Sequence, residues 1–290
     1  MRKWFKRFLL ALALGLALLA LFLTGGFVLL RGKPSYYRQS TLTAEQKAQA
    51  ATRAESKLSQ LQNMAVDAHG AQVQKLRGVT QPATLPGATT FSFTDEELNA
   101  LFNKWAEVNN WKAVLSPVVE DPMIVLQDSR IILAGKVTLK NMDTIVSIHF
   151  EPEIDDEGRL DLRLVSILGG KLPLPRESIM QPVRKRISQE LSEYLPELQL
   201  RAAMTPEGAV NESAAKALYC ELLNNTLHDH PSAGALFLPM LSAHNNLAPF
   251  KLTNITIEDN TLSFTVLPMD QSACAQLLEQ VKQPIEVEHQ

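Results

Sequence analysis

Residues 8–30 form an uncharged run of 23 residues, from Phe8 to Leu30, that limits what the chain can become. A helix rises about 1.5 Å per residue, so a helix of this length crosses a hydrocarbon core of about 30 Å. Four basic residues lie within the first seven positions, and no second run of this kind follows. We therefore expect one N-terminal transmembrane helix that anchors the rest of the chain.

A cleaved signal peptide is the alternative, but its apolar region is usually about 7 to 15 residues long and ends at small residues. This run is longer, and its only small-residue break, at residues 24–26, is followed by more apolar sequence. Arg31, Lys33 and Arg38 follow the run, so the positive-inside bias is slight. We place residues 1–7 in the cytoplasm, residues 8–30 in the cell membrane and the bulk of the chain outside, in the periplasm or on the outer surface.

Charge is distributed unevenly along the chain. Seven of the 28 lysines and arginines precede residue 39, whereas none of the 31 acidic residues precedes Glu45. Residues 39–290 thus carry 21 basic and 31 acidic side chains, a net charge of −10. Phosphate contacts need a basic surface, so nucleic acid is not expected as a partner.

Candidates for chemistry are few, and no motif of a hydrolase elbow, phosphate loop or zinc protease occurs. Residues 228–230 (His-Asp-His), with His244, form the best candidate metal site, but zinc needs three or four converging ligands. Cys220 lies in an Ala/Leu-rich segment typical of a packed thiol. Residues 155–157, with Gly158, indicate a solvated turn. We expect no enzyme, no catalytic or metal-binding residue and no cofactor. Cys220 and Cys274 leave two alternatives, one disulfide or two buried thiols.

Residues 31–42 are predicted to be a linker, and residues 43–290 one extracytoplasmic domain. Thr43 and Gln46 have capping-box spacing, which predicts a helix start. The stripe behind them either packs on its own domain, which we favour, or forms a seam between two copies. Gly70 and the stretch at residues 78–87, which contains Pro82 and Pro86, are expected to end the helix. The stripe consists of Ala51, Ala54, Leu58, Leu61, Ala65 and Ala68.

A second helix is predicted from Thr94, because Glu97 completes another capping box. After this helix, the spacing of apolar residues changes from the helical repeat to every second residue, as in a strand. Apolar runs at 123–126 and 131–139 flank a polar turn at 127–130, and every second residue is apolar at 146–150 and at 160–164, on either side of a turn at 155–158. This pattern predicts an antiparallel meander with one apolar face.

Three further elements are predicted beyond residue 175. Apolar residues step by four from Ile179 to Leu195, indicating a helix that Pro196 ends and that starts or kinks at Pro182. Another helix is predicted from residue 205 to about Leu227. A hairpin is predicted over residues 252–266. The fold class is α+β: an antiparallel meander with covering helices, preceded by the transmembrane helix and the long alanine-rich helix.

The segment Phe93-Thr94-Asp95-Glu96-Glu97-Leu98-Asn99-Ala100-Leu101 resembles the opening motif of the YpmS-like family of bacterial proteins. The hairpin at 124–137, the strand ending at 150–152 and the segment 170–175 follow in the same order. The match covers about residues 90–195. The resemblance implies an N-terminal transmembrane helix and an extracytoplasmic α+β domain, and it supplies no catalytic residue.

Two functions fit these patterns. One is a binding module whose curled sheet holds a lipid or other apolar ligand beside the bilayer. The other is a protein-interaction scaffold in an envelope assembly, docking through the alanine stripe or a sheet edge. The same apolar face could equally be a filled core. The ligand site is predicted to be lined by Val146, Ile148, Phe150, Leu160, Leu162 and Leu164.

Overall fold

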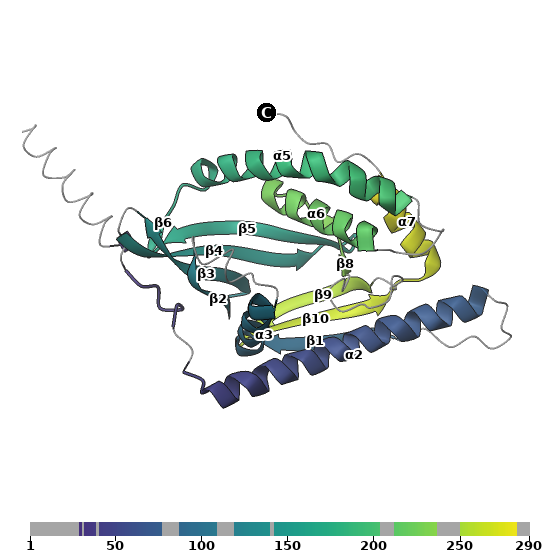
Figure 1. Ribbon diagram of the computed structural model, residues 1–290, viewed down its shortest axis with the longest axis horizontal. Coiled ribbons are helices and arrows are strands. Elements are labelled where there is room, and N and C mark those ends of the chain that lie inside the picture. Colours follow the sequence, from purple (N-terminus) through teal and green to yellow (C-terminus); the bar gives the residue numbers. More distant parts are fainter. Residues whose placement is uncertain are drawn as a thin grey trace, which may run out of the picture.

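The computed structural model describes residues 29–30, 32–38, 41–76, 87–108, 119–139, 142–203, 212–236 and 250–282. These residues form an α+β fold with antiparallel strands, as predicted, but the strands are divided between two sheets and do not form one meander (Figure 1). The helices are α2 (Ala44–Leu76), α3 (Asp95–Val108), α5 (Arg176–Ala203), α6 (Glu212–His228) and α7 (Gln271–Lys282). The strands are β1 (Thr89–Thr94), β2 (Glu120–Gln127), β3 (Arg130–Leu139), β4 (Met142–Ile154), β5 (Arg159–Gly169), β6 (Leu172–Pro173), β7 (Ser232–Ala233), β8 (Ala235–Leu236), β9 (Phe250–Glu258) and β10 (Thr261–Pro268).

The predicted anchor lies outside the described residues except for Leu29 and Leu30. None of the helices within the described ranges combines the length and the apolar character needed to cross a membrane.

The larger sheet has the strand order β2-β3-β4-β5-β6, with β7 paired to β5, and it contains the predicted meander. Asp128 and Ser129 join β2 to β3 with φ values of 52° and 59°. Two successive positive φ values are typical of the hairpin turn that matches the twist of its strands. Ile148 pairs with Leu133 on one side and with Ile167 on the other, so an apolar row crosses three strands.

The smaller sheet has the order β1-β10-β9-β8. The predicted hairpin at its centre is confirmed, with Asp259 and Asn260 in the turn at φ values of 47° and 60°. β1 was not predicted as a strand. It pairs with β10 along its whole length, and the hydroxyls of Ser92 and Ser263 lie 2.8 Å apart across a separation of 171 residues.

Helix α2 packs along the smaller sheet (Figure 1). Its capping box is confirmed, because the Thr43 N–H donates to Gln46 Oε1 (2.8 Å) and the Gln46 N–H donates to Thr43 Oγ1 (3.2 Å). Gly70 does not end the helix, because one helical glycine costs only about 1 kcal/mol and Ala71 is buried beyond it; α2 ends at Leu76, shortly before the second predicted breaker at residues 78–87. The stripe packs on its own domain, with these members buried: Ala51, Ala54, Leu61, Ala65 and Ala68.

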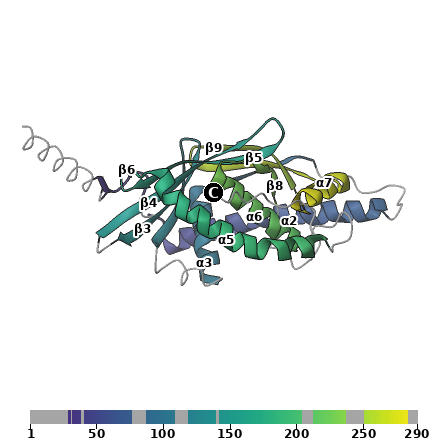
Figure 2. The same ribbon diagram turned by 90° about the horizontal axis from the view of Figure 1, so that it is seen from above.

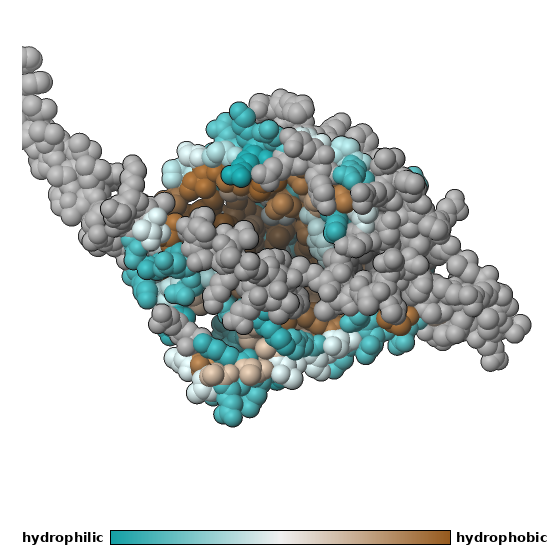
Figure 3. Space-filling view, in the orientation of Figure 1, coloured by the Kyte–Doolittle hydropathy of each residue, from teal (hydrophilic) through white to brown (hydrophobic). Residues whose placement is uncertain are grey.

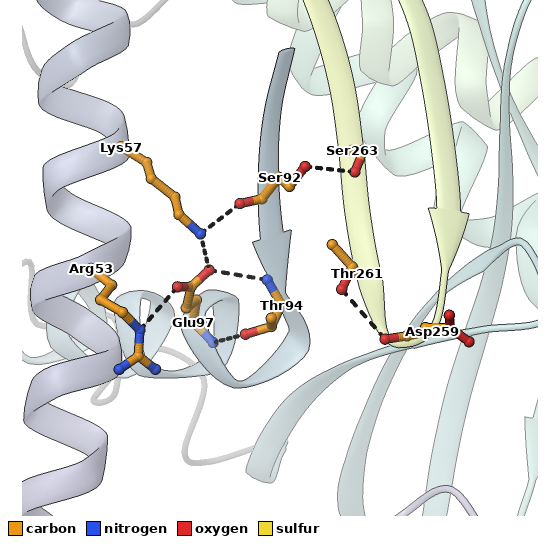
Figure 4. Close-up of polar contacts among 8 residues, drawn as sticks. All are labelled: Arg53, Lys57, Ser92, Thr94, Glu97, Asp259, Thr261 and Ser263. Atoms are coloured by element: carbon orange, nitrogen blue, oxygen red, sulfur yellow. Dashed lines mark hydrogen bonds and ion pairs between the residues drawn. The ribbon is translucent and has the colours of Figure 1, made fainter.

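A buried carboxylate, Glu97, ties α2 to β1 and α3 (Figure 4). It accepts hydrogen bonds from Lys57 Nζ (2.6 Å), Arg53 Nε (3.2 Å) and the Thr94 N–H (3.1 Å). The Glu97 N–H in turn donates to Thr94 Oγ1, which completes the second predicted capping box. Burial alone would raise the pKa of Glu97, but these hydrogen bonds outweigh burial and hold the pKa below its usual value.

Helices α5 and α6 lie side by side over one face of the larger sheet (Figure 2). α5 continues through both Pro182 and Pro196, so the predicted end at Pro196 is wrong. A proline inside a helix costs about 3 kcal/mol. Leu195 and Leu198 are buried on either side of Pro196, and this packing holds the helix together across it.

The remaining predictions concern the last third of the chain. The start of the helix predicted from residue 205 lies outside the described residues, and its end is close to His228, where α6 ends. Helix α7 was not predicted.

Candidate functional site

One wall of the candidate site is the face of the larger sheet that α5 and α6 cover. Strand alternation places Val146, Ile148 and Phe150 of β4 on this face. Their register partners across β3 are Gly135, Leu133 and Ile131. The deep part of the face is closed by a buried cluster that the three β4 residues pack against: Leu164, Ile167, Met180 and Leu227.

The opposite wall is a stripe on α5. Ile179, Val183 and Ile187 follow one another at steps of four residues, which places them on one side of the helix. Ile179 and Ile187 pack against the same buried cluster as the β4 residues. Val183 therefore lies between two side chains that point towards the sheet.

The two walls do not close on each other. Val146, Ile148, Phe150, Ile179 and Ile187 are only half-buried. Leu133 and Val183 are 42% and 37% exposed. Figure 3 shows a hollow with hydrophobic walls between α5 and the larger sheet. We call this the groove; its residues are Leu133, Val146, Ile148, Phe150, Ile179, Val183 and Ile187.

The predicted ligand residues fall into two groups. Val146, Ile148, Phe150 and Leu164 come together, three as groove walls and Leu164 in the floor. Leu160 instead packs with the cluster under α2, because the tip of the β4–β5 hairpin extends over the smaller sheet. Leu162 pairs with Pro152, is half-buried and belongs to neither cluster.

Sequence reasoning missed Leu133 and Val183, the two most exposed groove residues. Leu133 lay in a correctly predicted strand, and its alternation assigned it to a face. Val183 lay in the correctly recognised stripe of steps of four. The missing information was which helix covers which strands, since this contact joins elements far apart in the sequence.

Residues 29–30 and 32–38 lie along the larger sheet, and we call them the strap. Residues 29–30 lie at the end of the sheet where β4 begins and β5 ends, whereas Tyr36 and Tyr37 lie on the face opposite the groove. At the sheet end, the Lys171 N–H donates to the Leu29 carbonyl (2.8 Å) and Thr144 Oγ1 donates to the Leu30 carbonyl (2.6 Å). Tyr37 is buried against this opposite face, and its hydroxyl donates to the Asp121 carbonyl (3.0 Å). Residues 32–38 of the predicted linker are thus docked onto the domain.

The strap also forms a polar cluster with β4. Tyr36 Oη lies 2.7 Å from Ser147 Oγ and 3.2 Å from His149 Nε2, and Ser147 Oγ lies 3.1 Å from His149 Nε2. Burial, together with the positive charge of Arg130, lowers the pKa of His149. The Tyr36 and His149 rings meet edge to face, with their centres 5.5 Å apart.

The other candidates for chemistry are accounted for by structural contacts. Asp229 forms ion pairs with Arg176 and Arg184, and His228 Nδ1 lies 2.8 Å from the Asn224 carbonyl oxygen. His244 lies outside the described residues. Among the residues that the structure describes, no three His, Cys, Asp or Glu side chains converge on one point.

Two further polar candidates have the environments of structural groups. Cys220 is a free, half-buried thiol, and burial raises its pKa, which disfavours the reactive thiolate. Asp155 accepts hydrogen bonds from the backbone N–H groups of Glu157 and Arg159 and pairs with the Arg159 side chain (2.8 Å), which is the geometry of a solvated turn.

Comparisons with protein families, with characterised proteins and with solved structures found no match to this chain.

Proposed function

We propose that this protein is a membrane-anchored extracytoplasmic binding protein that holds the acyl chain of a lipid in the groove. The observation that carries the proposal is that two apolar walls face each other while Leu133 and Val183 remain 42% and 37% exposed. A filled core would bury both side chains. A hydrocarbon chain between the walls would bury them instead.

Burial of an acyl chain in the groove would supply enough free energy for reversible binding. Each buried methylene contributes about 0.8 kcal/mol, so about eight of them contribute about 6 kcal/mol before the cost of immobilising the chain. The groove residues are aliphatic or aromatic, which suits a hydrocarbon better than a polar ligand. The expected anchor at residues 8–30 and the resemblance to the YpmS-like family support a site beside a bacterial membrane.

The alternative, a docking scaffold, would use either the alanine stripe of α2 or a sheet edge. Ala54, Ala65 and Ala68 are buried against the chain's own sheet, which leaves that surface occupied. Lipid binding is therefore the proposal that a specific feature of the described residues favours.

Titration with a fluorescent fatty acid tests the proposal. Residues 29–290, which retain the strap, are expected to bind the probe and to increase its fluorescence. Leu133→Asp places a charge in the groove and should weaken binding by about tenfold or more, equal to about 1.4 kcal/mol. The matched control is Leu267→Asp, since Leu267 is also a strand leucine and is 39% exposed.

Circular dichroism is recorded for each variant to verify that it is folded. Absence of probe binding by the unmodified sequence would refute the proposal. Equal loss of binding in both variants would indicate that the probe does not bind in the groove.

A further inference from the structure

The end of the predicted anchor is fixed to one end of the groove. Leu30 is the last residue of the 23-residue apolar run. Its carbonyl accepts a hydrogen bond from Thr144 Oγ1 at the start of β4, and the Leu29 carbonyl accepts one from the Lys171 N–H after β5. The chain therefore leaves the anchor directly at this edge of the larger sheet.

The side chain of Leu30 lies on the groove face of the sheet. Gly169 pairs with Val146, a groove residue, so both positions share that face. A Cβ on Gly169 would lie 2.9 Å from Leu30 Cδ2 and 3.3 Å from Leu174 Cδ1. Leu30 and Leu174 thus cover the same glycine, and a side chain at this position would press against the ends of both leucines.

Leu174 continues this apolar surface into the groove. It packs against the buried cluster that also supports Val146 and Ile148 on the sheet and Ile179 on α5. The Leu174 N–H donates to the Ile167 carbonyl (2.9 Å), which holds the segment between β6 and α5 against β5. Apolar side chains therefore extend from the end of the predicted anchor to both walls of the groove.

Two lysines lie at the same end. A Cβ on Gly32 would lie 3.2 Å from Lys171 Cδ, so the Lys171 stem passes beside the strap. Lys33 Nζ lies 5.8 Å from the centre of the Tyr37 ring. Neither lysine forms an ion pair with the residues that the structure describes. Ammonium groups next to a bilayer attract anionic head groups.

We propose that the groove opens at this end onto the bilayer, and that an acyl chain of an anionic membrane phospholipid enters it past Leu30 and Leu174. This proposal rests on the proposed function, since it assumes that the groove binds an acyl chain. It adds the source of the ligand, the surrounding membrane, and the path by which the ligand arrives. The lysines hold the phosphate of the lipid near the surface while its chain lies in the groove.

The test uses the full chain in vesicles of phosphatidylcholine and phosphatidylglycerol that contain a trace of phosphatidylglycerol with a diazirine on one acyl chain. Illumination and peptide mass spectrometry then locate the labelled residues. A second sample receives a short diazirine fatty acid from the aqueous phase, which reaches the groove from solution. Peptides from β4 and α5 report occupancy of the groove in both samples.

Two variants obstruct the proposed passage, one by size and one by charge. Gly169→Ala places a methyl group against Leu30 and Leu174, and Leu174→Asp places a charge on the path. Gly169→Ala should reduce groove labelling by the vesicle lipid several-fold and leave labelling by the aqueous fatty acid unchanged. Leu174→Asp should reduce labelling by the vesicle lipid several-fold more than labelling by the aqueous fatty acid. Leu267→Asp, in β10 of the smaller sheet, should change neither the labelling by the vesicle lipid nor the labelling by the fatty acid. Retained labelling by the aqueous probe also verifies that each variant is folded.

The outcomes separate the two proposals. If neither probe labels the groove in the unmodified chain, the proposed function itself fails. If the aqueous probe labels the groove but the vesicle lipid does not, or if the two passage variants leave lipid labelling unchanged, the groove binds acyl chains but does not receive them through this opening.

Discussion

The hydroxyl of Tyr36 lies 2.7 Å from that of Ser147, a side chain with no exposed surface. His149 Nε2 lies within hydrogen-bond distance of both oxygens. The strap is thus attached to the larger sheet through a histidine whose neutral form is favoured.

The free energy of unfolding should fall as the pH is lowered below about 6.5, because of His149. The pKa of His149 is lowered in the folded protein by burial and by Arg130, so the unfolded chain binds a proton more readily. Above about pH 6.5 both states are neutral and the free energy of unfolding is unaffected. Below that pH the unfolded state gains protons first, and the free energy of unfolding decreases until the folded-state pKa is reached. Denaturant unfolding at pH 7.5 and pH 5.5 measures the difference.

Substitution identifies the histidine responsible. His149→Gln should reduce the pH dependence, whereas His230→Gln, at an exposed position, should leave it unchanged. An identical pH dependence in the His149 variant and the unmodified protein would contradict the assignment.

The alanine stripe of α2 gives a matched pair of substitutions. Ala65 is 2% exposed and its neighbour Val66 is 46% exposed. Ala65→Glu buries an unpaired charge in a packed core and should lower the free energy of unfolding by about 3 kcal/mol or more. Val66→Glu should change it by about 0.5 kcal/mol or less. If Ala65→Glu kept full stability and abolished association between copies, the stripe would be a seam after all.

Glu97 should contribute far more than an exposed acid with a comparable ion pair. Glu97→Gln leaves Lys57 and Arg53 without their carboxylate and should lower the free energy of unfolding by about 2 kcal/mol. Glu120→Gln, which removes an exposed pair with Lys136, should cost about 0.5 kcal/mol. Chemical denaturation at pH 7 provides both values, and equal costs would argue against a special role for Glu97.

Acid should remove the contribution of Glu97. Its pKa is lowered on folding, so the stabilisation is complete above the unfolded value of about 4.5 and is lost as the pH falls through the folded value. The difference between Glu97→Gln and the unmodified protein should therefore shrink between pH 5 and pH 3. A constant difference across that range would contradict this explanation.

Lys33 of the strap and the neighbouring Lys171 should set a preference for anionic lipid. Lys33→Glu with Lys171→Glu should reduce labelling of the groove by diazirine phosphatidylglycerol relative to diazirine phosphatidylcholine. Lys185→Glu, an exposed substitution further along α5, serves as the control. If the double variant keeps the same ratio of phosphatidylglycerol to phosphatidylcholine labelling, the two lysines do not recognise the head group.

Local patterns predicted the local parts of the fold. Both capping boxes, both hairpin turns and the meander depend on residues within a few positions of each other, and all are present. The errors arose where distant contacts override local preference. Leu195 and Leu198 hold α5 across Pro196, and β1 is a strand because β10 pairs with it.

The candidate site, too, was predicted where local pattern decides the structure and was missed where distant contacts decide it. Alternation correctly placed Val146, Ile148 and Phe150 on one face, and the register extends that face to Leu164. It gave Leu160 the same role, although the hairpin tip packs against the other sheet. Alternation defines a face, and only the tertiary arrangement determines which element covers each part of it.

The attachment of the strap has a mechanical consequence. Tension applied along the chain at Leu29 passes into Thr144 at the start of β4 and into the turn after β5, through the two carbonyl hydrogen bonds. Gly170 has a φ of +59°, and a Cβ at this position would lie 2.3 Å from the Leu30 carbonyl oxygen, so the close approach of the two segments requires glycine here. A pull on residues 29–30 is therefore shared between two neighbouring strands of the larger sheet and does not act on one strand end alone.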